Sequence, residues 1–106
     1  MKHIIPFLLF LAACTATPAP QFFGAERHDI TVEGVRFVVF VKEDAAEVVR
    51  MGYLARRDRG HAITLMPQAA ERASGCQVRG ALTGVGKSPS LPGDSGEARF
   101  KLKCPP

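Results

Sequence analysis

The sequence lacks a long uninterrupted apolar segment, which excludes a membrane-spanning helix of ordinary length. Its most apolar stretch covers only residues 4–13 and includes Pro6, whereas a spanning helix needs about 20 consecutive apolar residues. At 106 residues, the chain is long enough for one small domain. The core of such a domain is modest, so we expect a covalent bond to support it.

The sequence also lacks a cluster of residues that would bind a metal ion or carry catalysis. His28 and His61 lie far apart, and neither has a carboxylate or thiol at the spacing of a zinc site. We expect both to be edge or loop histidines. The sequence therefore predicts no metal, no cofactor and no enzymatic activity.

Two short motifs resemble catalytic or nucleotide-binding motifs, but their surroundings do not fit. Residues 81–88 match the phosphate-loop pattern, yet two prolines within the next five residues prevent the helix whose amides would hold phosphate. Residues 93–96 read Gly-Asp-Ser-Gly and look like the nucleophile motif of trypsin-like proteases, whose chemistry needs a histidine base. Nothing in the sequence places His28 or His61 near Ser95, so a turn is the better interpretation.

Neither sign of charge dominates, and aromatic residues are few. The chain has 14 Lys and Arg against 10 Asp and Glu, a net charge of +4. This mild excess permits contact with anionic lipid, glycan or nucleic acid but requires none of them. Only Phe22, Phe23 and Tyr53 are candidates for exposed rings, and no nucleic-acid-binding motif is present, so nucleic acid is not favoured as a partner.

The N-terminus, by contrast, has the pattern of an export signal. A basic start is followed by the apolar residues 4–13, which end in small side chains. The sequence Leu11-Ala12-Ala13-Cys14 resembles the lipobox that the bacterial lipoprotein signal peptidase cuts. The resemblance implies that residues 1–13 are a signal peptide and that Cys14 becomes the lipidated N-terminus. A diacylglyceryl group plus an N-acyl chain is enough for stable membrane anchoring.

An ordinary secretory signal, cleaved later near Ala16 or Ala19, is the alternative. In the lipoprotein interpretation, residues 14–25 form the lipidated cysteine and a Pro/Ala-rich tether, and residues 26–106 form the domain. The protein then belongs to the cell envelope, at the outer membrane or the periplasmic face of the inner membrane. Loss of Lys2 lowers the net charge to +3.

Once Cys14 is assigned to lipid, Cys76 and Cys104 remain, and in an oxidising compartment a disulfide between them is the default. Residues 76–83 and 97–104 alternate apolar and polar side chains, as half-buried strands do. Antiparallel pairing with the two cysteines opposite each other gathers all the apolar residues on one face. The expected pairs are Val78 with Leu102, Gly80 with Phe100, and Leu82 with Ala98.

The other face of this hairpin is basic, and it is the candidate contact surface for an anionic partner. Its four cations are Arg79, Arg99, Lys101 and Lys103. Arg79 would stand opposite Lys101, a repulsion that a neighbouring strand, water or an anionic partner must offset. A polar turn is expected to add three more cations: Arg56, Arg57 and Arg59. The alternative is that both groups simply face solvent.

An earlier hairpin is expected from residues 27–33 and 35–42, joined at Glu33-Gly34. Its pairs are Val32 with Val35, Ile30 with Phe37, and His28 with Val39. The second strand also carries Val38 and Phe40 on its nominally outer face, so it is expected to be central or covered.

Residues 45–57 are ambiguous, because Asp44 and Glu47 suit a helix capping box whereas the β-branched residues favour a strand, which we prefer. A helix is expected over 65–74, with Thr64 as its cap. Two further features belong to this segment: Pro67 is tolerated in the first turn, and Gly75 stops the helix. Residues 85–96 are predicted to be a loop.

The predicted fold is α+β, with one mostly antiparallel sheet of four or five strands and a single helix packed on one face. Residues 69–78 and 98–104 resemble small exported alphaproteobacterial proteins, a likeness that implies no activity. The favoured function is a membrane-anchored envelope lipoprotein that serves as a binding or accessory module through its basic face. Its expected partners are the membrane and an anionic envelope component. The alternatives are a small envelope hydrolase and a surface DNA- or glycan-binding protein.

Overall fold

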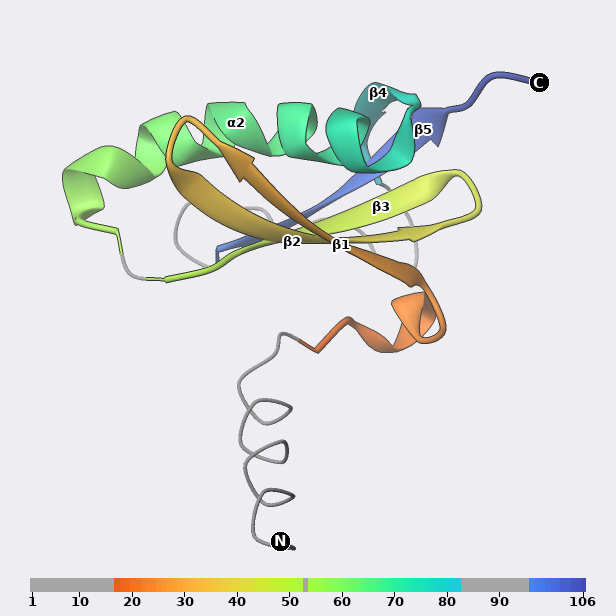
Figure 1. The fold of residues 1–106 in the computed structure, drawn as a ribbon, viewed down its shortest axis with the longest axis horizontal. Coiled ribbons are helices and arrows are strands. Elements are labelled where there is room, and N and C mark those ends of the chain that lie inside the picture. Colours follow the sequence, from red (N-terminus) through yellow and green to blue (C-terminus); the bar gives the residue numbers. More distant parts are fainter. Residues whose placement is uncertain (1–16, 53, 83–95) are drawn as a thin grey trace, which may run out of the picture.

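The computed structural model describes residues 17–52, 54–82 and 96–106, which form one five-stranded antiparallel sheet and one long helix (Figure 1). The strand order is β1-β2-β3-β5-β4. The strands are β1 (Glu26–Val32), β2 (Val35–Lys42), β3 (Ala45–Arg50), β4 (Gln77–Ala81) and β5 (Glu97–Lys103). Helix α2 (Arg56–Ser74) covers one face of the sheet, and the short 3-10 helix η2 (Pro20–Phe22) lies on the other side. The predicted α+β architecture is confirmed.

The β1–β2 hairpin has the register that the sequence predicts. Val32 pairs with Val35, and Ile30 and His28 stand opposite Phe37 and Val39. Both turn residues have positive φ, at 49° for Glu33 and 79° for Gly34. A two-residue turn of this kind matches the right-handed twist of the strands, and glycine adopts its second position without strain.

Strand β2 is buried on both of its faces, as expected. Phe37 and Val39 belong to the core beneath α2, while Val38 and Phe40 belong to a second cluster on the opposite face. The ring of Phe22, in η2, lies in this second cluster and is only 2% exposed. The molecule therefore has three layers: α2, the sheet, and the N-terminal segment 17–25.

Docking of this segment corrects the expected tether over 14–25. From residue 17 onward it packs on the sheet instead of running free, because Phe22 covers apolar side chains that β2 would otherwise expose to water. Packing thus begins before the expected domain boundary at residue 26. The expected signal peptide and Cys14 lie outside the described residues.

Helix α2 begins nine residues earlier than predicted, and this corrects two expectations. Arg56–Arg59 form its first turn instead of a polar turn, and Thr64 lies inside the helix, where its hydroxyl donates to the carbonyl of His61 at 2.6 Å. The N-cap residue, Ala55, makes no side-chain capping bond, so no local signal marks the start. An apolar stripe buried on the sheet stabilises the helix instead. Its buried residues are Ala62, Leu65, Met66, Ala69 and Ala70.

The end of α2 and the strand before it agree better with prediction. Gly75 has φ 73° and donates its N–H to Glu71, which ends the helix as expected. The preference for a strand over 45–57 holds for β3, which ends at Arg50. It is wrong beyond that residue, because Met51 and Gly52 leave the strand and α2 begins at Arg56. Pro67, expected in the first turn, lies in the helix interior.

The closing β4–β5 hairpin is bonded as predicted but shifts register partway along. A disulfide joins Cys76 and Cys104, with a Cα–Cα distance of 4.4 Å, and Val78 pairs with Leu102. Beyond a bulge between Val78 and Gly80, the pairs are Gly80 with Lys101 and Ala81 with Phe100. The expected Gly80–Phe100 and Leu82–Ala98 pairs are therefore wrong. Gly80 accommodates the irregularity with φ +134°.

Candidate functional site

The outer face of the sheet, turned away from α2, carries the β5 cations among the residues proposed from sequence. The antiparallel registers place Phe40 of β2, Glu47 of β3 and Arg99 of β5 in one cross-strand row. The next row contains Lys42, Ala45 and Lys101. Together with segment 17–25, these rows make the outer face an amphipathic surface, with an apolar centre and cations toward one end.

A buried ion pair lies beside the apolar centre of the outer face. Glu47 is 1% exposed, and its Oε2 accepts from Nε of Arg99 at 2.8 Å. Its other oxygen, Oε1, accepts from the backbone N–H of Ala19 at 2.9 Å. Removing a carboxylate from water is costly unless it gains such partners. Glu47 therefore joins β3, β5 and the docked N-terminal segment.

This arrangement changes the role expected for Arg99. The side chain of Arg99 is 15% exposed. Oε1 of Glu97 also lies near it, 3.5 Å from Nη2. Two carboxylates of the protein itself, those of Glu47 and Glu97, therefore already neutralise the charge of Arg99. The structure thus assigns Arg99 to the support of the sheet and the N-terminal segment, whereas sequence reasoning placed it in an anion-contact face.

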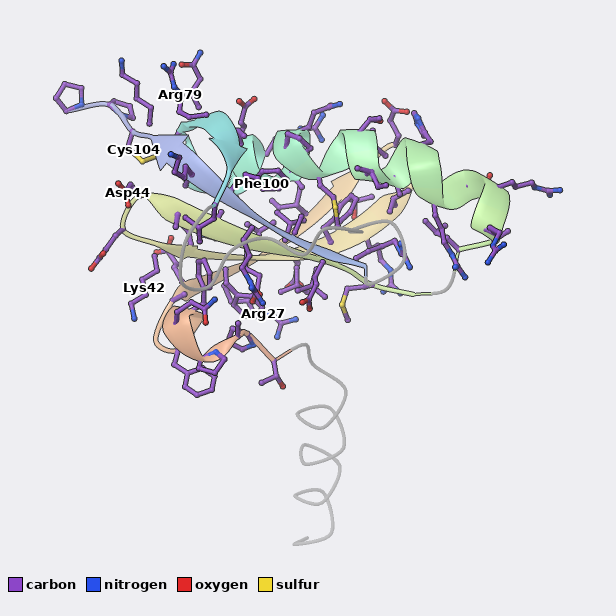
Figure 2. All side chains as sticks on the ribbon, turned by 180° about the vertical axis from the view of Figure 1, so that it is seen from behind. Arg27, Lys42, Asp44, Arg79, Phe100 and Cys104 are labelled. Atoms are coloured by element: carbon purple, nitrogen blue, oxygen red, sulfur yellow. A yellow bond between two sulfur atoms is a disulfide. The ribbon has the colours of Figure 1, made fainter. Side chains whose placement is uncertain are left out.

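The bulge separates Arg79 from the lysines of β5. Without an extra residue, Arg79 would face Lys101 directly; in the structure Gly80 takes that position. Figure 2 shows Arg79 at the same end as Cys104 and on the helix side of the molecule, while Lys42 lies on the opposite side. The repulsion expected between Arg79 and Lys101 is relieved by local backbone geometry.

The arginines of α2 do not join this surface either. Arg56 and Arg57 are exposed in the first turn of the helix, and Arg59 donates from Nε to the carbonyl of Leu54 at 3.1 Å. The helix has 19 residues, so about 28 Å separates its first turn from the end that leads to Cys76. The arginines of α2 therefore lie at the end of the helix that is far from the β4–β5 hairpin.

What remains of the predicted basic face is a smaller group, the lysine cluster, defined as Lys42, Lys101 and Lys103. All three are exposed. Lys42 of β2 and Lys101 of β5 both pair with Ala45 of β3, which lies between them. Two strand spacings put the Cα atoms of the lysines about 10 Å apart. Within the described part of the chain, neither Lys101 nor Lys103 forms an ion pair.

Sequence reasoning missed Lys42 and the structural role of Glu47. Lys42 was placed on the first hairpin, and nothing local indicates that β3 brings it next to β5. Glu47 was considered only as a capping residue. Strict alternation along β3 was the available signal, because it puts Glu47 on the same face as Val49, where a charge requires a partner.

Each of the two candidate histidines contacts an exposed carboxylate. Nε2 of His28 lies 2.8 Å from Oε1 of Glu26, and Nε2 of His61 lies 3.1 Å from Oε1 of Glu33. The two pairs occupy different elements, β1 and α2. Ser95, the expected partner of either histidine in a hydrolase, falls outside the described residues.

Two hollows lined by described residues contain no recognisable catalytic set. One, of about 260 Å³, lies over β1 and β2 beside Arg27 and Arg36. The other, of about 410 Å³, lies beside the disulfide and Lys103. Among the residues that the structure describes, no three His, Cys, Asp or Glu side chains gather into a metal-binding group. The helices in the same ranges are all too short or too polar to cross a bilayer.

Comparison with known proteins found no match: no family model, no curated protein and no solved structure is similar to this chain.

Proposed function

We propose that this protein is a lipid-anchored cell-envelope lipoprotein that acts as a non-enzymatic binding or accessory module. The observation that supports the anchor is the pairing of the other thiols. Cys76 is bonded to Cys104, so Cys14 is the one cysteine of the three left for another role. Cys14 directly follows the apolar residues 4–13, where lipobox cleavage makes it the N-terminal residue.

The same disulfide also supports export. Disulfides persist mainly in secreted and periplasmic proteins, since the cytosol keeps thiols reduced. The Cys76–Cys104 bond closes the ends of the β4–β5 hairpin and thereby fixes the last strand to the sheet. A domain with so small a core benefits from such a bond, which contributes about 3–4 kcal/mol for a 28-residue separation.

A binding role is favoured over a hydrolase by the arrangement of the charged groups. His28 and His61 each contact an exposed carboxylate rather than a hydroxyl or thiol. The lysine cluster, in contrast, gathers three exposed cations from β2 and β5, and two of them, Lys42 and Lys101, share one cross-strand row. Such a cluster suits an anionic envelope component, whose attraction weakens as ionic strength rises.

Metabolic labelling with a tagged fatty acid tests the anchor. The wild type is expected to take up the label and to fractionate with membranes. Cys14→Ser is expected to lose both properties, because the acceptor thiol is gone. The double variant Cys76→Ser/Cys104→Ser is the matched control and is expected to keep the label. Label that persisted in Cys14→Ser, or that never entered the wild type, would contradict the proposal.

A further inference from the structure

We infer that the outer face of the sheet lies against the anionic headgroups of the membrane that holds the protein, with the lysine cluster as its contact. The inference rests on the proposed lipid anchor at Cys14. It adds an orientation and a partner: the domain is held in one pose, and the anionic component is the lipid surface itself.

The length of chain between anchor and domain supports this orientation. Thr17 is the first described residue, and three peptide steps from Cys14 reach at most about 10 Å. Residues 17–25 then pack on the outer face through Phe22 and through the bond from Ala19 to Glu47. The chain therefore enters the molecule on the side opposite α2, as Figure 1 shows. A lipid at Cys14 keeps this side close to the bilayer.

The charges of the same side fit an anionic surface. Lys42, Lys101 and Lys103 are exposed there, and their long apolar stems allow the ammonium groups to reach headgroups. Lys42 also donates from Nζ to the backbone carbonyl of Phe23 at 3.0 Å, and Phe23 is itself 56% exposed. An amphipathic surface of cations and an apolar ring is the kind that binds the headgroup region.

Two acidic residues near this surface are already paired with arginines of the protein. Glu47 is buried against Arg99, and Asp29 pairs with Arg27 at 3.2 Å. The turn between β2 and β3 retains Glu43 and Asp44, both exposed, at the rim of the lysine cluster. This turn adjoins β5, because the carbonyl of Asp44 accepts from the N–H of Leu102 at 2.8 Å. The three lysines therefore exceed the two exposed acids beside them by one positive charge.

Lysine reactivity in reconstituted vesicles tests the orientation. The mature lipoprotein is placed in vesicles of phosphatidylglycerol and phosphatidylethanolamine, or of phosphatidylcholine alone, and acetylated with a membrane-impermeant ester. Mass spectrometry then reports the rate at each lysine. The variant Arg56→Lys/Arg57→Lys serves as the matched control, because it puts reporter lysines on the α2 layer without changing the net charge.

The rates at Lys42, Lys101 and Lys103 are expected to fall at least about fivefold in the anionic vesicles, the factor that one lysine contributes near such a surface. Added salt is expected to restore them. The reporters at positions 56 and 57 are expected to react equally fast in both vesicles. Equal rates at the lysine cluster, or equal slowing at the reporters, would overturn the orientation. If the anchor is wrong, no lipid-modified protein is recovered for reconstitution, so the two failures are distinguishable.

Discussion

The two oxygens of Glu47 receive hydrogen bonds from different parts of the chain, one from Arg99 and one from Ala19. Burying a carboxylate to 1% exposure is costly unless such partners replace its contacts with water. Removing one member of a buried pair leaves the other charge uncompensated, which costs more than the pair itself contributes. Glu47 is therefore a structural residue, although it looks like a surface residue in the sequence.

Replacing Glu47 with Gln is expected to lower the free energy of unfolding by about 3 kcal/mol, because Arg99 then loses its buried counter-ion. Chemical denaturation followed by circular dichroism measures this change. Asp29→Asn is the control: Asp29 is 78% exposed in its pair with Arg27, and such pairs contribute less than about 1 kcal/mol. Similar losses in the two variants would show that Glu47 has no special role.

Phe22 and Phe23 are neighbours in the chain but have opposite environments, at 2% and 56% exposure. Phe22→Ala is expected to cost about 3–5 kcal/mol of stability, the usual range for a buried phenylalanine. Phe23→Ala is expected to change stability by no more than about 0.5 kcal/mol. The same denaturation measurement compares them. A small effect at Phe22 would mean that segment 17–25 is not part of the folded body.

At the scale of the elements, short-range sequence patterns predict structures that form between neighbouring residues. The β1–β2 hairpin follows from two alternating strands around Glu33-Gly34, and both its register and its turn are as expected. The start of α2 could not be found this way, because Ala55 provides no cap and Gly60 lies in the second turn. Packing of the apolar stripe on the sheet outweighs the poor start.

Long-range pairing also limited prediction of the site. The disulfide and the first β4–β5 pair were predicted because a single register satisfied both the alternation and the bond. The bulge at Arg79 broke that register. A glycine inside a strand, here Gly80, is compatible with a bulge but does not by itself specify one. The pairing of β3 with β5, which creates both the Glu47–Arg99 pair and the lysine cluster, has no local signal.

Helix α2 provides a prediction of its own, since Pro67 lies in its interior. Proline has no N–H to donate to the preceding turn, and its ring crowds the carbonyl four residues earlier. Pro67→Ala is expected to raise the free energy of unfolding by about 1–2 kcal/mol, less than the full propensity difference because alanine frees the unfolded chain. Thermal unfolding measures it. A lower melting temperature would indicate that the helix depends on contacts of the proline ring.

At the scale of the whole molecule, the three cysteines have different roles. The disulfide closes the domain at one end of the sheet, and the N-terminal segment docks on the outer face. A lipid on Cys14 would hold that face near the bilayer and leave the α2 layer turned toward the surrounding compartment. The anchor, the orientation and the lysine contact form one proposal, in which the anchor comes first.

Intact-mass spectrometry of the protein extracted from membranes, under non-reducing conditions, tests the anchor most directly. The account predicts a chain that begins at Cys14, carries the mass of its acyl groups, and has no thiol that reacts with an alkylating agent. Reduction is expected to expose two thiols, at Cys76 and Cys104. A chain that begins after Ala16 or Ala19 and carries no lipid would contradict the account.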